Sequence, residues 1–421
     1  MEKKRLSELP DELLLKILSS LPMFKETLAT RLISKRWEGP WKLVPDVMFD
    51  DDDTPFKSFE TFMSFVYGSF LSTDDQILDR LHLKLNQNYS ASDINFWVQI
   101  AVNRSVRELR IDLFGKTLEL PCCLCSCRTL KELTLHGLCI KIVPPSFRLP
   151  SLEALHLLSV KFLGDESVAS LLKICPVLEH LVVDQIKNDN VMISNIDVPT
   201  LRNLSITNSK GKRGKRTYVE GSNGFVIKAP SLTDLNFEDT LSNFIMFEPM
   251  PEVIKANIQV ICDQSENFIG SLTSIQHLSL CSLTSKTPYP ACTVFSSLKH
   301  LELCTCSAGW ANLLTCILNA APELRSLKLK SKHSAKYSDP MSLWKEPTVV
   351  PDCLSKHLEI LEWRQYEGTE QERNVAEYTL ANATCLKMAT FSTRCRNKNH
   401  RMLKKLKSMD KISKTCQLVF D

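Results

Sequence analysis

Cysteine and histidine are the residue types through which this chain could carry chemistry, since it holds 16 cysteines and 9 histidines. Four cysteines crowd residues 122–127, and Arg128 follows them directly. The interval from Cys122 to Arg128 is that of a cysteine-phosphatase loop, in which a thiolate attacks a phosphate held by backbone amides. Such a loop needs glycines, and none lies in this interval. We therefore favour a turn with buried thiols over a phosphatase site.

The same crowded cysteines could indicate zinc, but structural zinc sites pair two ligand dyads at set spacing, and residues 122–127 have no second dyad. The sequence also has no phosphate-cradling glycine motif and no serine nucleophile elbow. We therefore expect no catalytic residue, no bound metal and no cofactor.

Composition limits the compartment and the partners. A long cysteine-containing chain whose first residues, Met1 to Arg5, are charged rather than apolar is typical of a reducing compartment. No apolar run approaches the roughly 20 residues that span a bilayer. The net charge of +4 is too small to indicate nucleic-acid binding by itself. We expect a protein of the cytoplasm, the nucleus or both, with neither membrane nor nucleic acid as a partner.

The chain repeats one six-residue pattern, which should form the elements that position its polar side chains. The pattern is an apolar residue, two residues of any kind, a second apolar residue, one residue of any kind and a third apolar residue. Most copies are spaced by 21 to 28 residues, which is typical of leucine-rich repeats. The pattern predicts an α/β solenoid of short parallel strands lining a concave face, with return segments on the convex side. Twelve copies begin at Leu78, Val106, Leu130, Leu152, Leu178, Leu201, Leu232, Val253, Ile275, Leu298, Leu324 and Leu358.

Alternate residues of these strands should face outward and form a concave recognition face. Several of these residues are histidines on different repeats. Instead of contributing to recognition, the histidines could form a pH-sensitive or metal-binding surface. The ninth residue of a copy is mostly apolar, as at Phe114, Leu138 and Val160, so we expect apolar closure of the turns. The candidate binding residues of this face are Glu108, Arg110, Glu132, His136, His156, His180, Asp234, Asn236, Lys255, His277, His300 and Glu302.

Residues 7–43 predict a compact helical module. A helix should begin at Pro10, with Leu13, Ile17, Leu18 and Leu21 as its apolar stripe. A second helix is expected over 25–32, and a short third one should carry Trp37 before Gly39 and Pro40 end it. So small a module buries little apolar surface and should need a partner.

The run from Leu9 to Leu13, the pair Leu21-Pro22 and the run from Ser34 to Trp37 resemble an F-box. The resemblance implies docking on a SKP-type linker protein, which holds the F-box to a cullin-RING ubiquitin ligase. Two stretches depart from the pattern: residues 23–26 are one residue longer, and 38–40 read Glu-Gly-Pro. By resemblance, the linker-binding residues would be Leu9, Pro10, Leu13, Ile17, Leu18 and Leu21, with Trp37 closing the core of the module.

Three segments outside the repeats carry further predictions. The acidic run 50–53 is either a divalent-ion site or a solvated loop, and we favour the loop because its acids do not alternate with a glycine turn. Phenylalanines between Phe56 and Phe70 predict a helix that caps the repeats. The basic run 210–216 is either a nuclear-import signal, a phosphate contact or a solvated loop.

After residue 349 we expect a strand from Leu358, a turn at Glu367-Gly368, a helix over 373–382, a strand over 386–392, a basic helix over 401–409 and a closing strand at 416–420. This order, with Trp363 and the terminal Cys-Gln-Leu-Val-Phe-Asp, resembles the FBD domain. The predicted organisation is an F-box over 1–45, a connector and cap over 46–77, leucine-rich repeats over 78–331, and an α+β FBD segment over 349–421.

In this order the three modules resemble plant F-box proteins with leucine-rich repeats and a C-terminal FBD. The resemblance implies a substrate-recognition adaptor of an SCF-type cullin-RING E3 ubiquitin ligase, in which the F-box binds the linker and the repeats bind the substrate. The alternative is a non-catalytic leucine-rich-repeat scaffold with a degenerate F-box.

Overall fold

The structure is a computed structural model of the chain, and it forms two compact units, Met1–Val191 and Met192–Asp421. Each unit is considered by itself. The described residues are 9–21, 24–52, 59–72, 77–141, 143–185, 190–208, 223–260, 269–282, 294–307, 309–331, 344–393 and 404–420.

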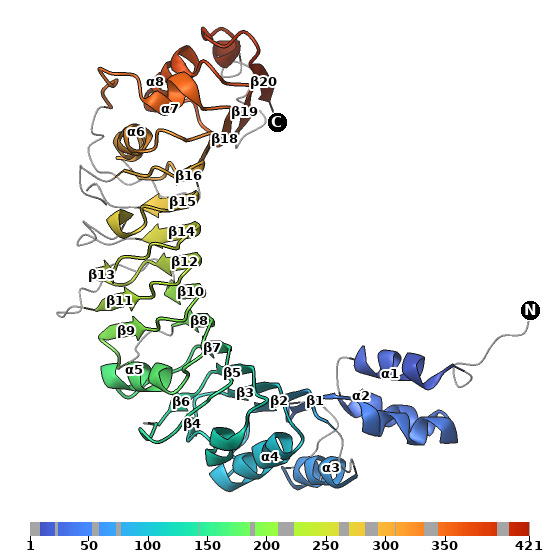
Figure 1. The fold of residues 1–421 in the computed structure, drawn as a ribbon. Helices are drawn as coiled ribbons and strands as arrows, with labels where there is room; N and C mark the ends of the chain where they lie inside the picture. Colours follow the sequence, from blue (N-terminus) through green and yellow to red (C-terminus); the bar gives the residue numbers. More distant parts are fainter. Residues whose placement is uncertain are drawn as a thin grey trace, which may run out of the picture. The chain divides into compact units, whose positions relative to one another are not determined.

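Short parallel strands, hydrogen-bonded to one another in chain order, are the main structural elements of each unit (Figure 1). In the first unit these are β1 (Asp46–Asp50), β2 (Arg80–Leu85), β3 (Glu108–Leu113), β5 (Glu132–His136), β7 (Ala154–Leu158) and β8 (His180–Asp184). In the second they are β10 (Asn203–Asn208), β12 (Asp234–Asp239), β14 (Lys255–Val260), β15 (His277–Ser282), β16 (His300–Cys304), β17 (Ser326–Lys330), β18 (Ile360–Tyr366), β19 (Met388–Thr393) and β20 (Gln417–Phe420).

All twelve predicted copies form a strand, and each strand begins two residues after the first apolar residue of its copy. The apolar residues point into the core, as in the copy of Leu298, Leu301 and Leu303, whose exposed fractions are 0%, 2% and 0%. Neighbouring strands pair with the same positions opposite each other, for example Leu278 with Leu301. The parallel-strand, leucine-rich-repeat prediction is therefore confirmed within each unit.

Helices and minor strands form the return segments. In the first unit these are α3 (Phe59–Ser72), α4 (Ala91–Asn103), η5 (Cys122–Ser126), α5 (Asp165–Lys173) and the pair β4 (Thr117–Leu118) and β6 (Cys139–Ile140). In the second they are η6 (Ile269–Ser271), α6 (Trp310–Ala320), α7 (Asp352–Lys356), α8 (Glu370–Asn382) and a second parallel sheet of β9 (Ile193–Asp197), β11 (Gly224–Lys228) and β13 (Phe244–Phe247). In the second unit α6, α7, α8 and the second sheet lie on one side of the repeat strands, and none of these elements covers the opposite strand face (Figure 1).

The second sheet of the second unit packs on the repeat strands through phenylalanines. The Phe237 ring, from β12, lies 5.5 Å from Phe225 and 5.3 Å from Phe247, edge-on to both. Phe237 and Phe225 are at most 1% exposed. These contacts hold the second sheet against the repeat strands.

The N-terminal module consists of α1 (Asp11–Ser19), α2 (Phe24–Ala29) and the 3₁₀ turns η2 (Thr30–Leu32), η3 (Lys35–Glu38) and η4 (Pro40–Leu43). The predicted third helix is thus a 3₁₀ turn, because Pro40 has no backbone N–H to continue a helix. The buried face of α1 consists of Leu14 and Leu18, whereas Leu13 is 43% exposed. The predicted stripe therefore lies partly on the outside.

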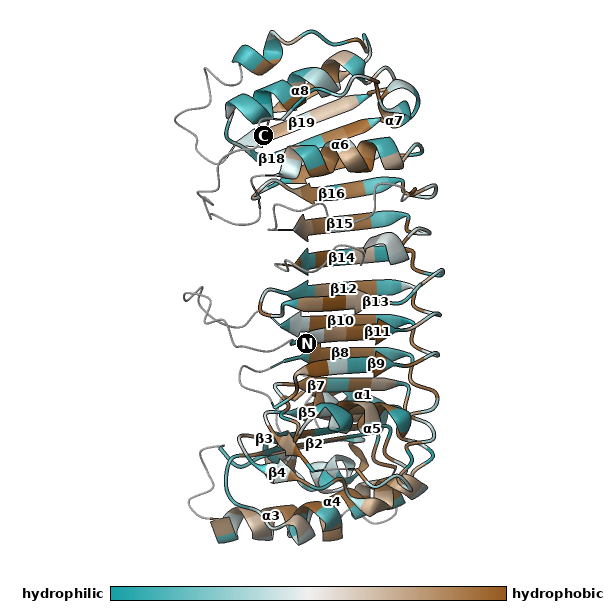
Figure 2. Cartoon of the chain, turned by 90° about the vertical axis from the view of Figure 1, so that its left-hand side faces the viewer, coloured by the Kyte–Doolittle hydropathy of each residue, from teal (hydrophilic) through white to brown (hydrophobic). Residues whose placement is uncertain are grey.

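The first repeat strand, β1, lies within the predicted connector and pairs in parallel with β2. Residues Val44, Val47 and Phe49 repeat the apolar pattern one step before the first recognised copy. The predicted capping helix is α3, which is apolar along most of its length (Figure 2). Its Phe70 ring lies 5.2 Å from Phe49 in β1, so α3 covers the first strand.

The turns between strand and return segment are closed by apolar side chains at Leu138 and Val160, which are 1% and 3% exposed, as predicted. Phe114 differs, because it is 44% exposed and its ring packs 5.2 Å from His136 on the outward face.

The C-terminal segment continues the same sheet, since β18, β19 and β20 pair in parallel beyond β17. Helix α8 begins at Glu370, three residues earlier than predicted, because Thr369 and Glu372 form a capping box. The preceding turn has Gly368 at φ +70°, a conformation that glycine adopts without strain. Of the predicted basic helix, the described part forms one turn at 404–407.

The acidic run 50–53 was predicted to be a solvated loop, but its residue Asp51 is buried, with 5% of its surface exposed. Its carboxylate accepts hydrogen bonds from the backbone amides of Asn86 and Gln87, at 2.8 Å each, and from the Tyr89 hydroxyl at 3.0 Å. The solvated-loop prediction is therefore wrong at this residue, because partners 35 to 38 positions away bury it. Asp53, Phe56 and the basic run 210–216 lie outside the described residues.

Replacing Asp51 by alanine is expected to lower the free energy of unfolding by about 2 to 4 kcal/mol, because two amides and a hydroxyl lose a buried acceptor. Chemical denaturation of the full chain measures the change. Asp52→Ala is the control, because Asp52 is exposed, and it should stay within about 0.5 kcal/mol of the wild type. Equal losses in both variants would contradict this assignment.

Among the described residues, no helix is long and apolar enough to cross a membrane.

Candidate functional site

The outward residues of the repeat strands form three columns in each unit. Residues 1, 3 and 5 of a strand point away from the core, and parallel pairing in register stacks each one on its counterpart in the next strand. Arg80, Glu108 and Glu132, for example, are successive members of the first column. Each unit thus presents its own grid of polar side chains.

All twelve predicted substrate-binding residues occupy these columns. His180, Asn236, Lys255 and His300 are exposed, and the other eight are partly exposed. The structure divides them between two grids. The first unit carries Glu108, Arg110, Glu132, His136, His156 and His180, and the second carries Asp234, Asn236, Lys255, His277, His300 and Glu302.

Asp112 is the centre of the grid of the first unit. Its buried carboxylate lies 3.0 Å from the Nε2 atom of His82 and accepts a 3.0 Å hydrogen bond from the Nε atom of Arg110. The Nδ1 atom of His136 lies 3.6 Å away, an ion-pair distance that is too long for a hydrogen bond. Burial by itself would raise the pKa of Asp112, but the hydrogen bonds with His82 and Arg110 outweigh it and lower the pKa to about 2.

Because the pKa of Asp112 is lower in the folded chain, its carboxylate stabilises the fold above the ordinary pKa of about 3.9, by about 2 kcal/mol, and loses this effect as pH falls toward 2. Asp112→Asn should therefore be less stable than the wild type by about that amount at pH 7, with a smaller difference at pH 3. Denaturant titrations at both pH values measure it. Glu119→Gln, at an exposed site, is the control and should show no such dependence.

Opposite charges alternate elsewhere on this grid. The Nε atom of Arg80 lies 3.2 Å from Glu108 and 3.6 Å from Asp46, and Lys84 lies 2.8 Å from Asp50. Burial raises the pKa of Glu108, and the nearby Arg80 opposes the shift. Such a surface can discriminate between partners by charge.

The grid of the second unit carries fewer charges. The Nδ2 atom of Asn236 donates to Ser205 at 2.9 Å, and that of Asn257 donates to Asn236 at 2.7 Å. His277 and His300 stack with parallel rings whose centroids are 4.3 Å apart, and burial followed by the charge of His300 lowers the pKa of His277. These side chains offer hydrogen bonds and flat ring faces to a partner.

Apolar side chains follow at the C-terminal end of this grid. Ile360 and Met388, from β18 and β19, are 39% and 40% exposed and occupy the first column. Neither residue is among the twelve predicted from the sequence, although their position two residues after Leu358 and Leu386 could have indicated them.

The crowded cysteines 122–127 form the 3₁₀ turn η5 and the residue after it. Burial raises the pKa of the Cys123 thiol to about 11, which disfavours a thiolate. The Oγ1 atom of Thr129 donates to the carbonyl oxygen of Val106 at 2.8 Å, tying the turn to the preceding copy. These contacts support an inter-repeat turn.

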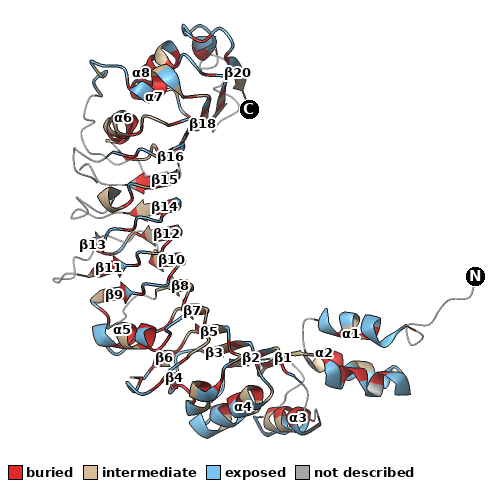
Figure 3. Cartoon of the chain, viewed as in Figure 1, coloured by how far each residue is buried: buried red, intermediate tan, exposed pale blue. Residues whose placement is uncertain are grey.

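The predicted linker-binding residues differ in exposure. Pro10 is exposed, and Leu9, Ile17 and Leu21 are partly exposed. Leu18 and Trp37, by contrast, are each 1% exposed. Most of α1 remains open (Figure 3). Leu18 therefore belongs to the core of the module and offers no surface to a linker.

Two hydrogen bonds from Arg36 position the entry to α1. One guanidinium nitrogen of Arg36 donates to the carbonyl oxygen of Leu9 and to the Asp11 carboxylate, each at 2.8 Å. Arg36 thus joins the two F-box-like runs, Leu9 to Leu13 and Ser34 to Trp37, directly.

Comparisons with known proteins cover the whole chain. Residues 346–391 match the FBD family, and residues 94–257 match the family of the leucine-rich repeats of FBD-associated F-box protein At5g56370. The chain is 85% identical to putative FBD-associated F-box protein At5g56560 of Arabidopsis thaliana, over 100% of both chains. It is 55% identical to F-box/FBD/LRR-repeat protein At5g56570 of the same plant, over 99% of this chain and 92% of the relative.

Proposed function

Because this chain belongs to the plant family of F-box proteins with leucine-rich repeats and a C-terminal FBD domain, we propose that it is the substrate-recognition adaptor of an SCF-type cullin-RING E3 ubiquitin ligase. In this role it makes and breaks no bond itself and needs no cofactor. It raises the rate of ubiquitin transfer by holding a substrate near the ligase.

The N-terminal module, over residues 1–45, is the proposed F-box and binds the SKP-type linker. The observation that carries this proposal is the open apolar surface of α1 and its entry, where Leu13 is 43% exposed beside the exposed Pro10. Apolar side chains of this kind lose water contact when a partner covers them. The proposed contact set is Leu9, Pro10, Leu13, Ile17 and Leu21, with Trp37 supporting it from the core.

The outward grids of the repeats bind the protein substrate. Their twelve polar residues supply charge and hydrogen-bond complementarity, and a minority of them should carry most of the binding energy. The FBD segment, over 349–421, extends the surface with Ile360 and Met388. We place the adaptor in the cytoplasm, the nucleus or both.

Recovery of a SKP-type linker by the full-length chain tests this function. The wild type should retain the linker, and a variant carrying Leu9→Ala with Pro10→Ala should lose it, because both substitutions remove apolar surface at the entry to α1. Equal recovery by the two chains would remove the adaptor function.

The second candidate is a leucine-rich-repeat scaffold whose F-box no longer binds a linker. The observation that favours it is the pair of 3₁₀ turns η3 and η4, which stand where the resemblance would place a third helix. This candidate predicts that the wild type recovers no linker while other partners of the repeats are still bound.

A further inference from the structure

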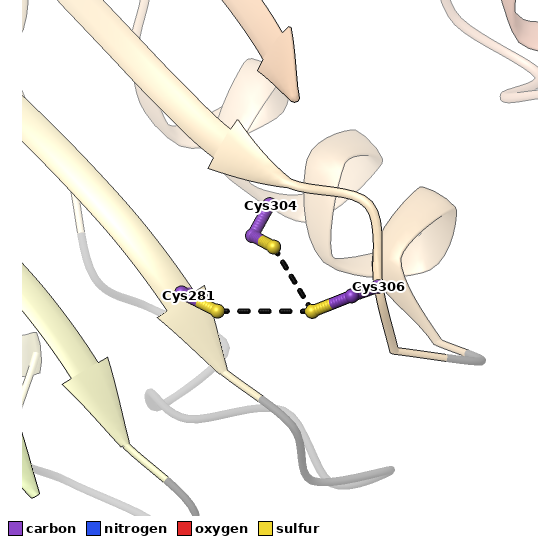
Figure 4. Close-up of side chains that lie close together, drawn as sticks. All are labelled: Cys281, Cys304 and Cys306. Carbon is purple, nitrogen blue, oxygen red and sulfur yellow. Dashed lines mark hydrogen bonds between the residues drawn. The ribbon is translucent and has the colours of Figure 1, made fainter. Parts of the chain in front are cut away.

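Three cysteines of the second unit gather at the carboxyl ends of β15 and β16. The Sγ atom of Cys306 lies 2.9 Å from that of Cys304 and 3.7 Å from that of Cys281 (Figure 4). All three sulfur atoms lie within 4.8 Å of one another. Among the described residues, this is the one group of three or more cysteine, histidine or acidic side chains that converges in this way.

The repeat geometry produces this cluster. Cys281 and Cys304 each hold the seventh position of their copies, and β15 and β16 pair in register up to Leu280 and Leu303. The third outward column therefore places these two side chains next to each other. Cys306 holds the ninth position, and its side chain points back to the strands from the loop that leads to α6 (Figure 4).

We propose that Cys281, Cys304 and Cys306 bind one thiophilic metal ion, zinc(II) or copper(I), through their three sulfur atoms. Thiolate sulfur selects these soft and borderline ions over calcium or magnesium. A Zn–S bond of about 2.3 Å places ligand sulfurs roughly 3.8 Å apart in a tetrahedral site. The separation of Cys281 and Cys306 already matches this, and that of Cys304 and Cys306 must widen by roughly 1 Å on metal binding.

The surroundings of the cluster suit a metal centre. Cys281 and Cys304 are 0% and 2% exposed, whereas Cys306 is partly exposed. The partial exposure of Cys306 gives an ion a way in and leaves room for solvent as a further ligand. Lys330 pairs in register with Cys304, so a lysine stands next to Cys304 in the same outward column.

Without metal, the thiols hold their protons. Hydrogen bonds with Cys304 and Cys306, together with burial, raise the pKa of the Cys281 thiol. At Cys306 the hydrogen bond with Cys281 lowers the pKa, but the contact with Cys304 and burial outweigh it and bring the pKa to about 12. Metal binding must therefore release protons, and the apparent affinity should increase with pH.

Metal titrations of the reduced, full-length chain test the site. Zinc(II), copper(I) and cobalt(II), the last as a spectroscopic probe of thiolate ligation, are each added to the wild type, Cys306→Ser and Cys122→Ser. The wild type should bind one more equivalent than Cys306→Ser and show thiolate-to-cobalt absorption. Cys122→Ser, altered in the other cysteine-rich segment, should match the wild type.

The metal content of the full-length chain purified from plant cells identifies which of the two ions occupies the site. Equal metal binding by the wild type and Cys306→Ser would overturn the proposal, and so would a Cys304–Cys306 disulfide in protein prepared under reducing conditions. Circular dichroism checks that Cys306→Ser is folded, and Cys304→Ala replaces it if it is not. Linker recovery by the same variants stays at the wild-type level, which separates this site from the proposed F-box function.

Discussion

Replacing Trp363 by alanine is expected to lower the free energy of unfolding of the second unit by about 3 to 5 kcal/mol. Trp363 is 1% exposed, and its ring lies 5.7 Å from Trp310 and 5.2 Å from Tyr366. Phe391 of the next strand stacks on it at 6.2 Å. The substitution therefore leaves a large cavity among aromatic rings that join β18, β19 and α6. Denaturant unfolding of the full chain measures the loss.

Trp363→Phe is the matched control for this prediction. It keeps an aromatic ring in the cluster, and it should cost less than half as much as alanine because less volume is removed. The control also removes the indole N–H, a group that the structure buries without a hydrogen-bond partner. A small effect of Trp363→Ala, within about 1 kcal/mol of the wild type, would contradict the position of Trp363 in the core.

Replacing Leu13 by aspartate is expected to weaken binding of a SKP-type linker at least about 30-fold, because a central apolar contact costs about 2 kcal/mol or more when it is lost. The new carboxylate lies in the first turn of α1, where a negative charge is compatible with the helix dipole, so folding should be retained. Calorimetric titration of the full-length chain with the linker measures the change.

Leu163→Asp is the matched control for Leu13→Asp. Leu163 is 51% exposed and lies among the repeats, whereas Leu13 is 43% exposed in the N-terminal module. The control should bind the linker as the wild type does. Equal weakening in both variants would show that the effect is not specific to the module, and no weakening in either would place the linker contact elsewhere.

The repeat strands could be predicted because one local pattern sets the position of each. Two apolar residues separated by one other residue face the same side of a strand, and each copy repeats this within its own six residues. The strand β1 was missed because its copy, from Val44 to Phe49, lies in the stretch assigned to the connector. Its distance of 34 residues to Leu78 equals the accepted step from Leu324 to Leu358.

Contacts between distant residues could not be predicted in this way. Asp51 looks like a solvated acid in sequence, and only its partners around residues 86 to 89 make it a buried acceptor. The cysteine cluster was missed for the same reason, because Cys281 and Cys304 belong to different copies. Their shared seventh position, together with Cys306 two residues after Cys304, was the available signal.

The exposure of the N-terminal leucines also required the structure. The helical pattern favours one stripe, yet Leu14 and Leu18 are buried while Leu13 is open. A stripe of apolar residues does not by itself distinguish the side that packs on its own chain from the side left for a partner.

Partner recovery from plant cells tests the central claim, that one end of this protein binds a ligase linker while the repeats bind something else. Wild type, Leu13→Asp and Leu163→Asp are expressed at equal levels, and bound proteins are quantified by mass spectrometry. The account predicts that Leu13→Asp loses the linker and the cullin and keeps the remaining partners, while Leu163→Asp keeps all of them. Recovery of the linker and cullin by Leu13→Asp at the wild-type level would contradict it.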